Sequence, residues 1–270
     1  MSFPRRRRLD ERRRERVMVA LVTGAAGGIG AEVARVLAED GVPVAAVDRD
    51  TDALRTVVGK LVADGLEAVA FAADVTSAAR VEAVVDEVER RLGPIDRLVN
   101  AAGVLRVGEV RTLSDDDWAA TFAVNVTGVF HVSRAVVNRM APRRAGAVVT
   151  VASNAAHTAR VGMSAYGASK AAVTMFTKNL GLEVARYGIR CNVVAPGSTD
   201  TPMLTALWHD GDGHRASIEG APDLYRTGIP LRKIARPADI AEAVAFLLSE
   251  RAGHITMQHL TVDGGATLGA

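Results

Sequence analysis

The stretch VMVALVTGAAGGIG, which runs from Val17 to Gly30, decides the fold. Its first half is a short apolar run typical of a buried strand, and its second half is a glycine-rich turn that leads into a helical pattern. Glycines at such a turn let bare backbone approach a pyrophosphate, whose charge is stabilised by the helix N-terminus. We therefore predict a nucleotide-binding strand–turn–helix unit that uses Gly24, Gly28, Ile29 and Gly30.

The same alternation continues along the chain. Apolar runs such as VPVAAVD, EAVAFAAD and AGAVVTVAS alternate with longer segments of helical period. Strands that are apolar throughout indicate a parallel sheet that is covered on both faces. We expect an α/β fold, a single doubly wound (Rossmann-type) parallel sheet with helices on both faces, formed by residues 17–270. Helices are predicted at residues 31–39, 54–63, 79–91, 115–140, 164–187 and 237–249.

The first sixteen residues differ in charge from the rest of the chain. They contain eight arginines and three acidic residues, whereas the remainder carries 25 basic and 28 acidic side chains. An arginine run can bind nucleic acid or an anionic membrane, but this one has no apolar face and no interleaved aromatic residues. We expect a flexible basic extension at residues 1–16, with no nucleic-acid partner and no membrane partner.

The composition also limits the classes of protein to which this chain can belong. No run approaches the roughly 18 apolar residues of a membrane span, and no secretory leader pattern follows the basic residues. Cys191 is the only cysteine, so neither an internal disulfide nor a cysteine-based metal site can form, and we expect no metal. We expect a cytoplasmic protein that takes its redox chemistry from a bound cofactor.

One long segment, at residues 198–228, lacks a regular pattern and mixes polar turns with apolar side chains. Loops of that length inside compact domains are usually functional. We interpret it as a substrate lid and not as a linker between domains.

Several further motifs follow predicted strands, and together with the G-x-x-x-G-x-G spacing they resemble the short-chain dehydrogenase/reductase family over nearly all of the chain after residue 17. The motifs are NAAG at residues 100–103, Asn125 in FAVNVTG, Ser153, YGASK from Tyr166 to Lys170, and Pro196-Gly197 followed by Thr201. The resemblance implies that Asp74 and Val75 flank an adenine, and Asp74 can act as a helix N-cap as well as, or in place of, this role. It also implies a cofactor cleft lined by Asn100, Ala101, Gly103, Pro196, Gly197, Thr199 and Thr201.

Asp48 ends the second strand, eighteen residues after Gly30. A carboxylate there can accept hydrogen bonds from ribose hydroxyls and would repel a 2′-phosphate, so we predict NAD over NADP. Arg49 beside it is a complication, because a guanidinium can pair with such a phosphate.

Tyr166 and Lys170 are four residues apart on a predicted helix, which places both side chains on one face. A phenol has an ordinary pKa of about 10, and both an adjacent ammonium and a positive nicotinamide favour its phenolate. We predict that Tyr166 takes the proton of a substrate hydroxyl and that Ser153 holds the substrate oxygen. Asn125 would position a water for the proton relay, and the family resemblance gives Lys170 a hydrogen bond to the nicotinamide ribose. A turn cap is the alternative role of Ser153, and a helix irregularity is that of Asn125.

The closer pattern includes the stretches LVNAAGVLRVGEV, VTVASNAAHTARVGMSAYGASKAA, RCNVVAPGSTDTPM, GIPLRKIARP and HITMQHLTVDGGATLGA. With these, residues 17–270 resemble the 2,3-dihydro-2,3-dihydroxybenzoate dehydrogenases of catecholate siderophore pathways within the family. This resemblance implies NAD-dependent oxidation of the C3 hydroxyl of a small cyclic carboxylate, giving 2,3-dihydroxybenzoate, by a homotetramer that assembles through helices 115–140 and 164–187. The carboxylate of such a substrate calls for a cation or convergent N–H donors in the pocket. We predict that Arg106 or Arg160 contacts it, with ion pairing at the surface or at a subunit interface as their alternative role. Met163 and Trp208 are predicted as apolar walls, and His157 as a structural side chain.

Three alternatives remain at this point. The ring could carry an amine, as in 2,3-dihydro-3-hydroxyanthranilate, which would give 3-hydroxyanthranilate. A generic ketone reductase would run the reaction towards the alcohol, which Asp48 disfavours because reductive enzymes tend to use NADP. A catalytically silent nucleotide sensor, scaffold or nucleic-acid binder is disfavoured by the complete set Asn125, Ser153, Tyr166 and Lys170.

Overall fold

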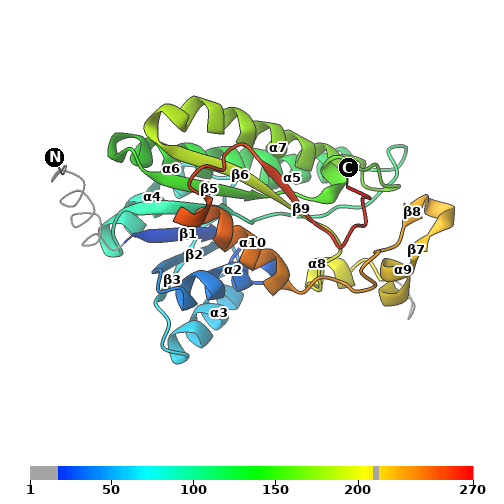
Figure 1. Cartoon of the computed structure of the whole chain (residues 1–270), viewed down its shortest axis with the longest axis horizontal. Helices are drawn as coiled ribbons and strands as arrows, with labels where there is room; N and C mark the ends of the chain where they lie inside the picture. Colours follow the sequence, from blue (N-terminus) through cyan, green and yellow to red (C-terminus); the bar gives the residue numbers. More distant parts are fainter. Residues whose placement is uncertain (1–17, 209–212, 270) are drawn as a thin grey trace, which may run out of the picture.

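The computed structural model describes residues 18–208 and 213–269, and the predicted extension at 1–16 lies outside them. A seven-stranded sheet with the order β3-β2-β1-β4-β5-β6-β9 forms the centre of the fold, and all its strands are parallel (Figure 1). The prediction of a doubly wound parallel sheet is confirmed. The strands are β1 (Val19–Thr23), β2 (Val44–Asp48), β3 (Ala68–Ala72), β4 (Ile95–Asn100), β5 (Gly146–Val151), β6 (Ile189–Pro196) and β9 (His259–Val262).

Helices cover both faces of the sheet (Figure 1). On one face lie α2 (Gly28–Glu39), α3 (Thr51–Ala63) and α10 (Pro237–Leu248), whose apolar residues form one core cluster with the sheet. On the other face lie α4 (Ala78–Arg91), α6 (Val129–Arg143) and α7 (Ser164–Val184). Because both faces are buried, the central strands have no polar side to present, which explains their continuous valine and alanine runs.

Short polar side chains set where several helices begin. Asp50 caps α3 by accepting a hydrogen bond from the nitrogen of Ala53, and Ser77 does the same for α4 with Arg80. The alternative role of Asp74 as the helix N-cap is therefore wrong, because Ser77 occupies that position three residues later.

The predicted helix at residues 115–140 contains a break in its hydrogen-bond pattern. It consists of α5 (Asp115–Phe122), a π-helical turn η1 (Ala123–Gly128) and α6. Within the described residues, the run Asp115–Arg143 is the one helix long and apolar enough to cross a membrane by length and composition, and half of its apolar window is buried inside the fold. It is a core helix of this domain, which packs on β4 and against α4.

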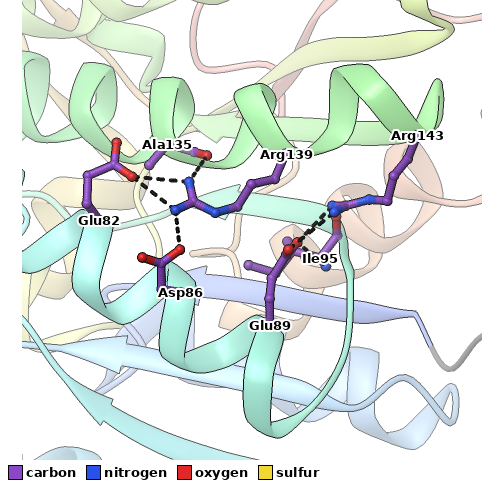
Figure 2. Close-up of polar contacts among 7 residues, drawn as sticks. All are labelled: Glu82, Asp86, Glu89, Ile95, Ala135, Arg139 and Arg143. Carbon is purple, nitrogen blue, oxygen red and sulfur yellow. Dashed lines mark hydrogen bonds and ion pairs between the residues drawn. The ribbon is translucent and has the colours of Figure 1, made fainter.

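Ion pairs join α6 to α4 across the surface of one helix layer. Arg139 donates through Nη1 and Nη2 to the same oxygen of Glu82 at 3.1 Å and also reaches Asp86, while Arg143 lies 2.8 Å from Glu89 (Figure 2). Arg143 also donates to the carbonyl of Ile95 at the start of β4. Because the acidic partners of Arg139 are about half exposed, we assign each of those pairs no more than about 1 kcal/mol.

The segment at residues 198–228, predicted as an irregular lid, is more regular than its sequence indicates. It contains α8 (Pro202–Thr205), α9 (Gly213–Glu219), the short turn η4 (Pro222–Leu224) and a hairpin of β7 (Gly220–Ala221) and β8 (Arg226–Thr227). These elements lie together beyond one end of the sheet (Figure 1). Several of their residues line the pocket described below.

Candidate active site

A pocket of about 440 Å³ opens where the central strands end. Residues at or just after the carboxyl ends of β1, β2, β4, β5 and β6 line it, as expected for a doubly wound sheet. All but one of the predicted cofactor residues belong to its lining: Gly24, Gly28, Ile29, Gly30, Asp48, Arg49, Asp74, Val75, Ala101, Gly103, Tyr166, Lys170, Pro196, Gly197, Thr199 and Thr201.

The glycine loop leaves no space for side chains at two positions. Gly24 has φ +71°, and a Cβ there would lie 2.7 Å from the nitrogen of Ala102. A Cβ on Gly30 would lie 2.1 Å from the carbonyl oxygen of Gly24. The loop and the first turn of α2 therefore pack backbone to backbone, which presents bare main chain to the pocket.

Thr23, which no motif in the sequence marks as a site residue, fixes the loop that follows β4. Its hydroxyl donates to the carbonyl of Val99 and accepts hydrogen bonds from the nitrogens of Ala101 and Ala102, both at 3.2 Å. One buried threonine thus joins the ends of β1 and β4, the two neighbouring strands at which the strand order of the sheet reverses. Its position at the end of the first strand was the only available sequence signal.

Asp48 ties the end of β2 to the glycine loop. Its Oδ2 accepts a hydrogen bond from the nitrogen of Ala26 at 3.1 Å, and its Oδ1 accepts one from the nitrogen of Asp50 at 3.0 Å. Each oxygen keeps a further lone pair. The carboxylate is therefore held at the pocket wall and can still accept hydrogen bonds from a ligand.

Asp74 and Arg49 line the same part of the pocket. The main-chain nitrogen and hydroxyl of Thr76 both donate to Asp74 Oδ1, at 2.9 and 2.8 Å. The main-chain hydrogen bond is the largest cause of a lowered pKa of Asp74, and the charge of Arg49 contributes in the same direction. Two carboxylates thus give this end of the pocket a negative character that Arg49 only partly offsets.

Asn100 lies behind the pocket wall and is not among the lining residues. Its amide nitrogen donates to the hydroxyl of Ser133 at 3.0 Å and to that of Thr150 at 3.4 Å, and the side chain is buried. The structure therefore places Asn100 as a support of the strand ends, and its contact with a cofactor stays a prediction.

Tyr166, Lys170 and Ser153 come together on one wall of the pocket. The Lys170 Nζ lies 5.6 Å from the centre of the Tyr166 ring and donates to the carbonyl of Val151 at 3.0 Å. Ser153 is also the N-cap of a short turn, η2 (Asn154–Ala156), and accepts a hydrogen bond from Ala155, so its cap role and its place in the site coexist.

Burial controls the protonation of this group. It raises the pKa of the Tyr166 phenol, against the effect of a hydrogen bond with Ser153. Burial also lowers the pKa of Lys170 to about 8. The enclosed wall by itself therefore keeps the phenol neutral, and a base role requires positive charge close to it.

Asn125 lies in the π-helical turn η1, so the predicted helix irregularity is present at this residue. Its side chain is buried, accepts a hydrogen bond from the nitrogen of Val104 at 2.8 Å, and donates to the carbonyl of Val104 and the hydroxyl of Ser169, both at 3.0 Å. The amide braces the loop after β4 against α7, and the predicted positioning of a water stays a prediction.

The predicted substrate residues divide into two groups. Arg160 and Met163 line the pocket, whereas Arg106 and Trp208 do not. The Arg106 guanidinium lies 3.6 Å from Asp117 on α5, and the Trp208 indole donates to Ser217 at 3.3 Å.

His157, predicted as structural, lies outside the pocket lining and contacts the ring of His259 edge to face. Sequence reasoning missed Leu204, Leu207 and Arg226, which come from the segment at residues 198–228 and line the pocket. No spacing or motif marks these three residues.

The chain is similar in sequence and fold to known proteins. A family model for short chain dehydrogenases matches residues 18–212. A 2,3-dihydro-2,3-dihydroxybenzoate dehydrogenase of Bacillus subtilis is 55% identical over 251 residues, which cover 93% of this chain and 96% of the relative. An enzyme of the same name from Escherichia coli is 47% identical over 252 residues, covering 92% and 96%. The solved structure of an actinorhodin polyketide ketoreductase with NADPH has a TM-score of 0.85 and 38% identity, covering 92% of this chain and 97% of the other.

The chain therefore belongs to the short-chain dehydrogenase/reductase family. It is an oxidoreductase of the kind that uses a nicotinamide cofactor, and the residues present fit such a group. The glycine loop forms a cradle that side chains would fill, and Asp48, Tyr166 and Lys170 lie along one continuous pocket.

Proposed function

We propose that this protein oxidises the C3 hydroxyl of 2,3-dihydro-2,3-dihydroxybenzoate with NAD, giving 2,3-dihydroxybenzoate. The observation that carries the proposal is the 55% identity, over nearly the whole of both chains, to a 2,3-dihydro-2,3-dihydroxybenzoate dehydrogenase. The pocket supports it, because the tyrosine, lysine and serine that such an oxidation needs share one wall.

The choice of NAD rests on Asp48. Its carboxylate lines the pocket beside the glycine loop, where the adenosine ribose would lie, and can accept hydrogen bonds from two ribose hydroxyls. The 2′-phosphate of NADP would be repelled by the negative charges of Asp48 and Asp74. We assign the reaction to the cytoplasm, in keeping with a buried, unpaired Cys191.

Tyr166 is the proposed base. Its phenolate oxygen accepts the proton of the C3 hydroxyl while hydride leaves the same carbon, and Ser153 holds the substrate oxygen in place. The oxidised nicotinamide supplies the hydride acceptor and a positive charge when it is bound. That charge and the Lys170 ammonium oppose the effect of burial on the pKa of Tyr166. The resulting ketone tautomerises to an aromatic ring, which draws the oxidation forward.

Lys170 is proposed to hold the nicotinamide ribose. Its Nζ lies beside Gly103, where a Cβ would come within 3.4 Å of both Nζ and Asn125. A side chain at residue 103 would take up space beside the ammonium, and the glycine leaves that space to the ribose. Asn125 is proposed to order a water that passes the proton from Lys170 towards solvent.

A second copy of the chain is proposed to cover the outer helices, in a homotetramer. Met175 is 57% exposed and Leu182 is 70% exposed on α7, two helical turns apart and therefore on one face. Trp118 on α5 and Phe130 on α6 are also exposed large apolar residues. Light scattering after gel filtration measures the number of chains, and a monomer would contradict this part of the proposal.

Turnover of defined substrates tests the activity. The purified protein is incubated with NAD and either 2,3-dihydro-2,3-dihydroxybenzoate or 2,3-dihydro-3-hydroxyanthranilate, and NADH absorbance and product mass are followed. We expect 2,3-dihydroxybenzoate from the first substrate at the higher kcat/KM. A preference for the amine, or reduction of simple ketones with NADPH as the only activity, would overturn the proposal. The same assay with NADP in place of NAD tests the assignment of the cofactor.

A further inference from the structure

Two arginines from distant parts of the chain line the same pocket. Arg160 lies in the loop between η2 and α7, and Arg226 begins β8 in the segment at residues 198–228. Across residues 18–208 and 213–269, neither arginine forms an ion pair with a carboxylate. A cation in a partly enclosed pocket without an anionic partner is unusual in a folded protein.

The guanidinium of Arg226 is held in place but retains unused donors. Its Nη2 donates to the carbonyl of Ala216 at 2.7 Å, which fixes the side chain against α9. Its Nε is buried and has no hydrogen-bond partner among the described residues. A buried donor without a partner costs free energy, so the hydrogen-bonding capacity of this guanidinium is satisfied only when an acceptor binds beside Nε.

The charges around the two arginines leave this region of the pocket positive. Burial and then the neighbouring charge of Arg226 lower the pKa of Arg160, whereas Asp263 raises it. The carboxylate of Asp263 already accepts hydrogen bonds from Asn154, Gly265 and Thr267. An anion placed between the guanidiniums would relieve their mutual repulsion, which Asp263 offsets only in part.

We propose that Arg226, together with Arg160, binds the carboxylate of the substrate, and that this pair makes the pocket select anionic rings over neutral ones. Arg160 comes from the same loop as the apolar Met163, and Leu204 and Leu207 from the 198–228 segment also line the pocket, so the anion site adjoins apolar walls suited to a ring. The inference rests on the proposed function and assigns the specificity of that site to a residue that no motif marks.

The test compares two substrates on the same enzyme preparation. One is 2,3-dihydro-2,3-dihydroxybenzoate, and the other is cyclohexadiene-1,2-diol, which lacks the carboxylate. We expect Arg226→Gln and Arg160→Gln each to lower the ratio of the two kcat/KM values by roughly tenfold to a hundredfold, as for the loss of a charge-assisted hydrogen bond. Because the ratio is taken on one sample, a fraction of unfolded protein cancels.

Arg215→Gln is the matched control. Arg215 lies on α9 in the same segment, pairs with Glu219 on the surface and does not line the pocket, so we expect its ratio to equal that of the wild type. An unchanged ratio in Arg226→Gln would overturn the assignment, even if Arg160→Gln lowers it. An equal fall in Arg215→Gln would also overturn it, because net charge alone would then explain the effect.

A binding measurement separates this inference from the proposed function. Calorimetric titration of the NADH complex with 2,3-dihydroxybenzoate should give a Kd that rises roughly tenfold or more in Arg226→Gln. If the wild type binds this anion through Arg226 but does not oxidise the diene-diol, the proposed function fails and the anion site stands. If the wild type oxidises the diene-diol and Arg226→Gln binds the anion equally well, the inference fails alone.

Discussion

The two ends of the pocket differ in what lines them, because main chain forms one end and long side chains form the other. At the cofactor end, main chain from the glycine loop after β1 and from the turns after β2 and β4 forms the wall. Thr23 and Asp48 hold these turns together by accepting hydrogen bonds from main-chain nitrogens. At the substrate end, long side chains such as those of Arg160, Met163 and Arg226 form the wall. These side chains come from the loop before α7 and from the segment at residues 198–228.

This difference separates what the fold requires from what the substrate requires. A side chain at Gly30 would displace the backbone of Gly24, so the cofactor end cannot change without changing the strand–turn–helix unit itself. Arg226 or Met163 can be replaced while every strand of the sheet keeps its neighbours. Backbone packing therefore restricts which residues can occupy the cofactor end, whereas residues at the substrate end can be substituted to fit a different substrate.

The largest effect is expected where the two ends meet. Tyr166→Phe removes the proposed base and should lower kcat by roughly a hundredfold to ten-thousandfold, the usual range for general acid–base catalysis. NADH affinity, followed by fluorescence titration, should change less than about threefold, or ~0.65 kcal/mol. Tyr187→Phe, a tyrosine outside the pocket, is the control. Retention of appreciable kcat in Tyr166→Phe would remove Tyr166 from the base role.

The next effect tests the rigidity of the cofactor end. Gly30→Ala places a Cβ 2.1 Å from the Gly24 oxygen, and such overpacking typically costs about 1–3 kcal/mol. We expect the Kd for NADH to rise roughly tenfold or more. Gly59→Ala in α3 meets no atom within 4 Å and should instead raise the free energy of unfolding by about 0.5–1 kcal/mol. Equal NADH affinity in both variants would show that the loop is not rigid.

A third effect concerns stability and its dependence on pH. Burial lowers the pKa of Lys170 to about 8 from 10.5, so the unfolded chain binds more protons between these values and stability rises with pH across that window. Below pH 8, burial of the ammonium lowers the free energy of unfolding by about 3 kcal/mol. Its hydrogen bond to the Val151 carbonyl restores about 1 kcal/mol of this.

Lys170→Met should therefore be inactive yet about 2 kcal/mol more stable than the wild type at pH 7. Urea unfolding at pH 7 and pH 10 measures this difference, and the gain should shrink at the higher pH. A variant that is less stable than the wild type at pH 7 would show that Lys170 is not held as a costly buried cation.

The smallest effect concerns the choice between cofactors. Asp48→Asn keeps hydrogen-bond acceptance but removes a charge, and should shift the ratio of kcat/KM for NAD over NADP towards NADP about fivefold, or ~1 kcal/mol for a partly screened charge. Asp50→Asn is the control, because asparagine caps a helix as well as aspartate does. An equal ratio in both variants would mean that Asp48 does not set the cofactor preference.

Sequence predicts the cofactor end well because its determinants are local. A glycine loop between a strand and a helix, an acidic residue at the next strand end, and a tyrosine and lysine one helical turn apart are patterns of short spacing. The structure places all these residues in one pocket. Asn100 is the exception, because which way a strand-end side chain points depends on its neighbours Ser133 and Thr150, which are distant in sequence.

The substrate end was predictable only in part, for a physical reason. Arg106 and Arg160 were both predicted because they lie near the site motifs along the chain, but Arg106 is outside the pocket lining and forms an ion pair with Asp117 in the first turn of α5. Arg226 lies sixty residues beyond Tyr166 and reaches the pocket because the β7–β8 hairpin lies beyond the end of the sheet. Contacts of this kind depend on tertiary packing that no periodicity in a single sequence encodes.

The buried amide of Asn125 has a mechanical consequence. It forms hydrogen bonds with both the nitrogen and the carbonyl oxygen of Val104, and it donates to the hydroxyl of Ser169. That hydroxyl in turn donates to the carbonyl of Tyr166. A displacement of the tyrosine's helix therefore pulls on the loop at Val104, which is itself part of the pocket wall. The proton acceptor and this part of the pocket wall are therefore joined by a continuous chain of hydrogen bonds, so we expect a displacement of either one to be transmitted to the other.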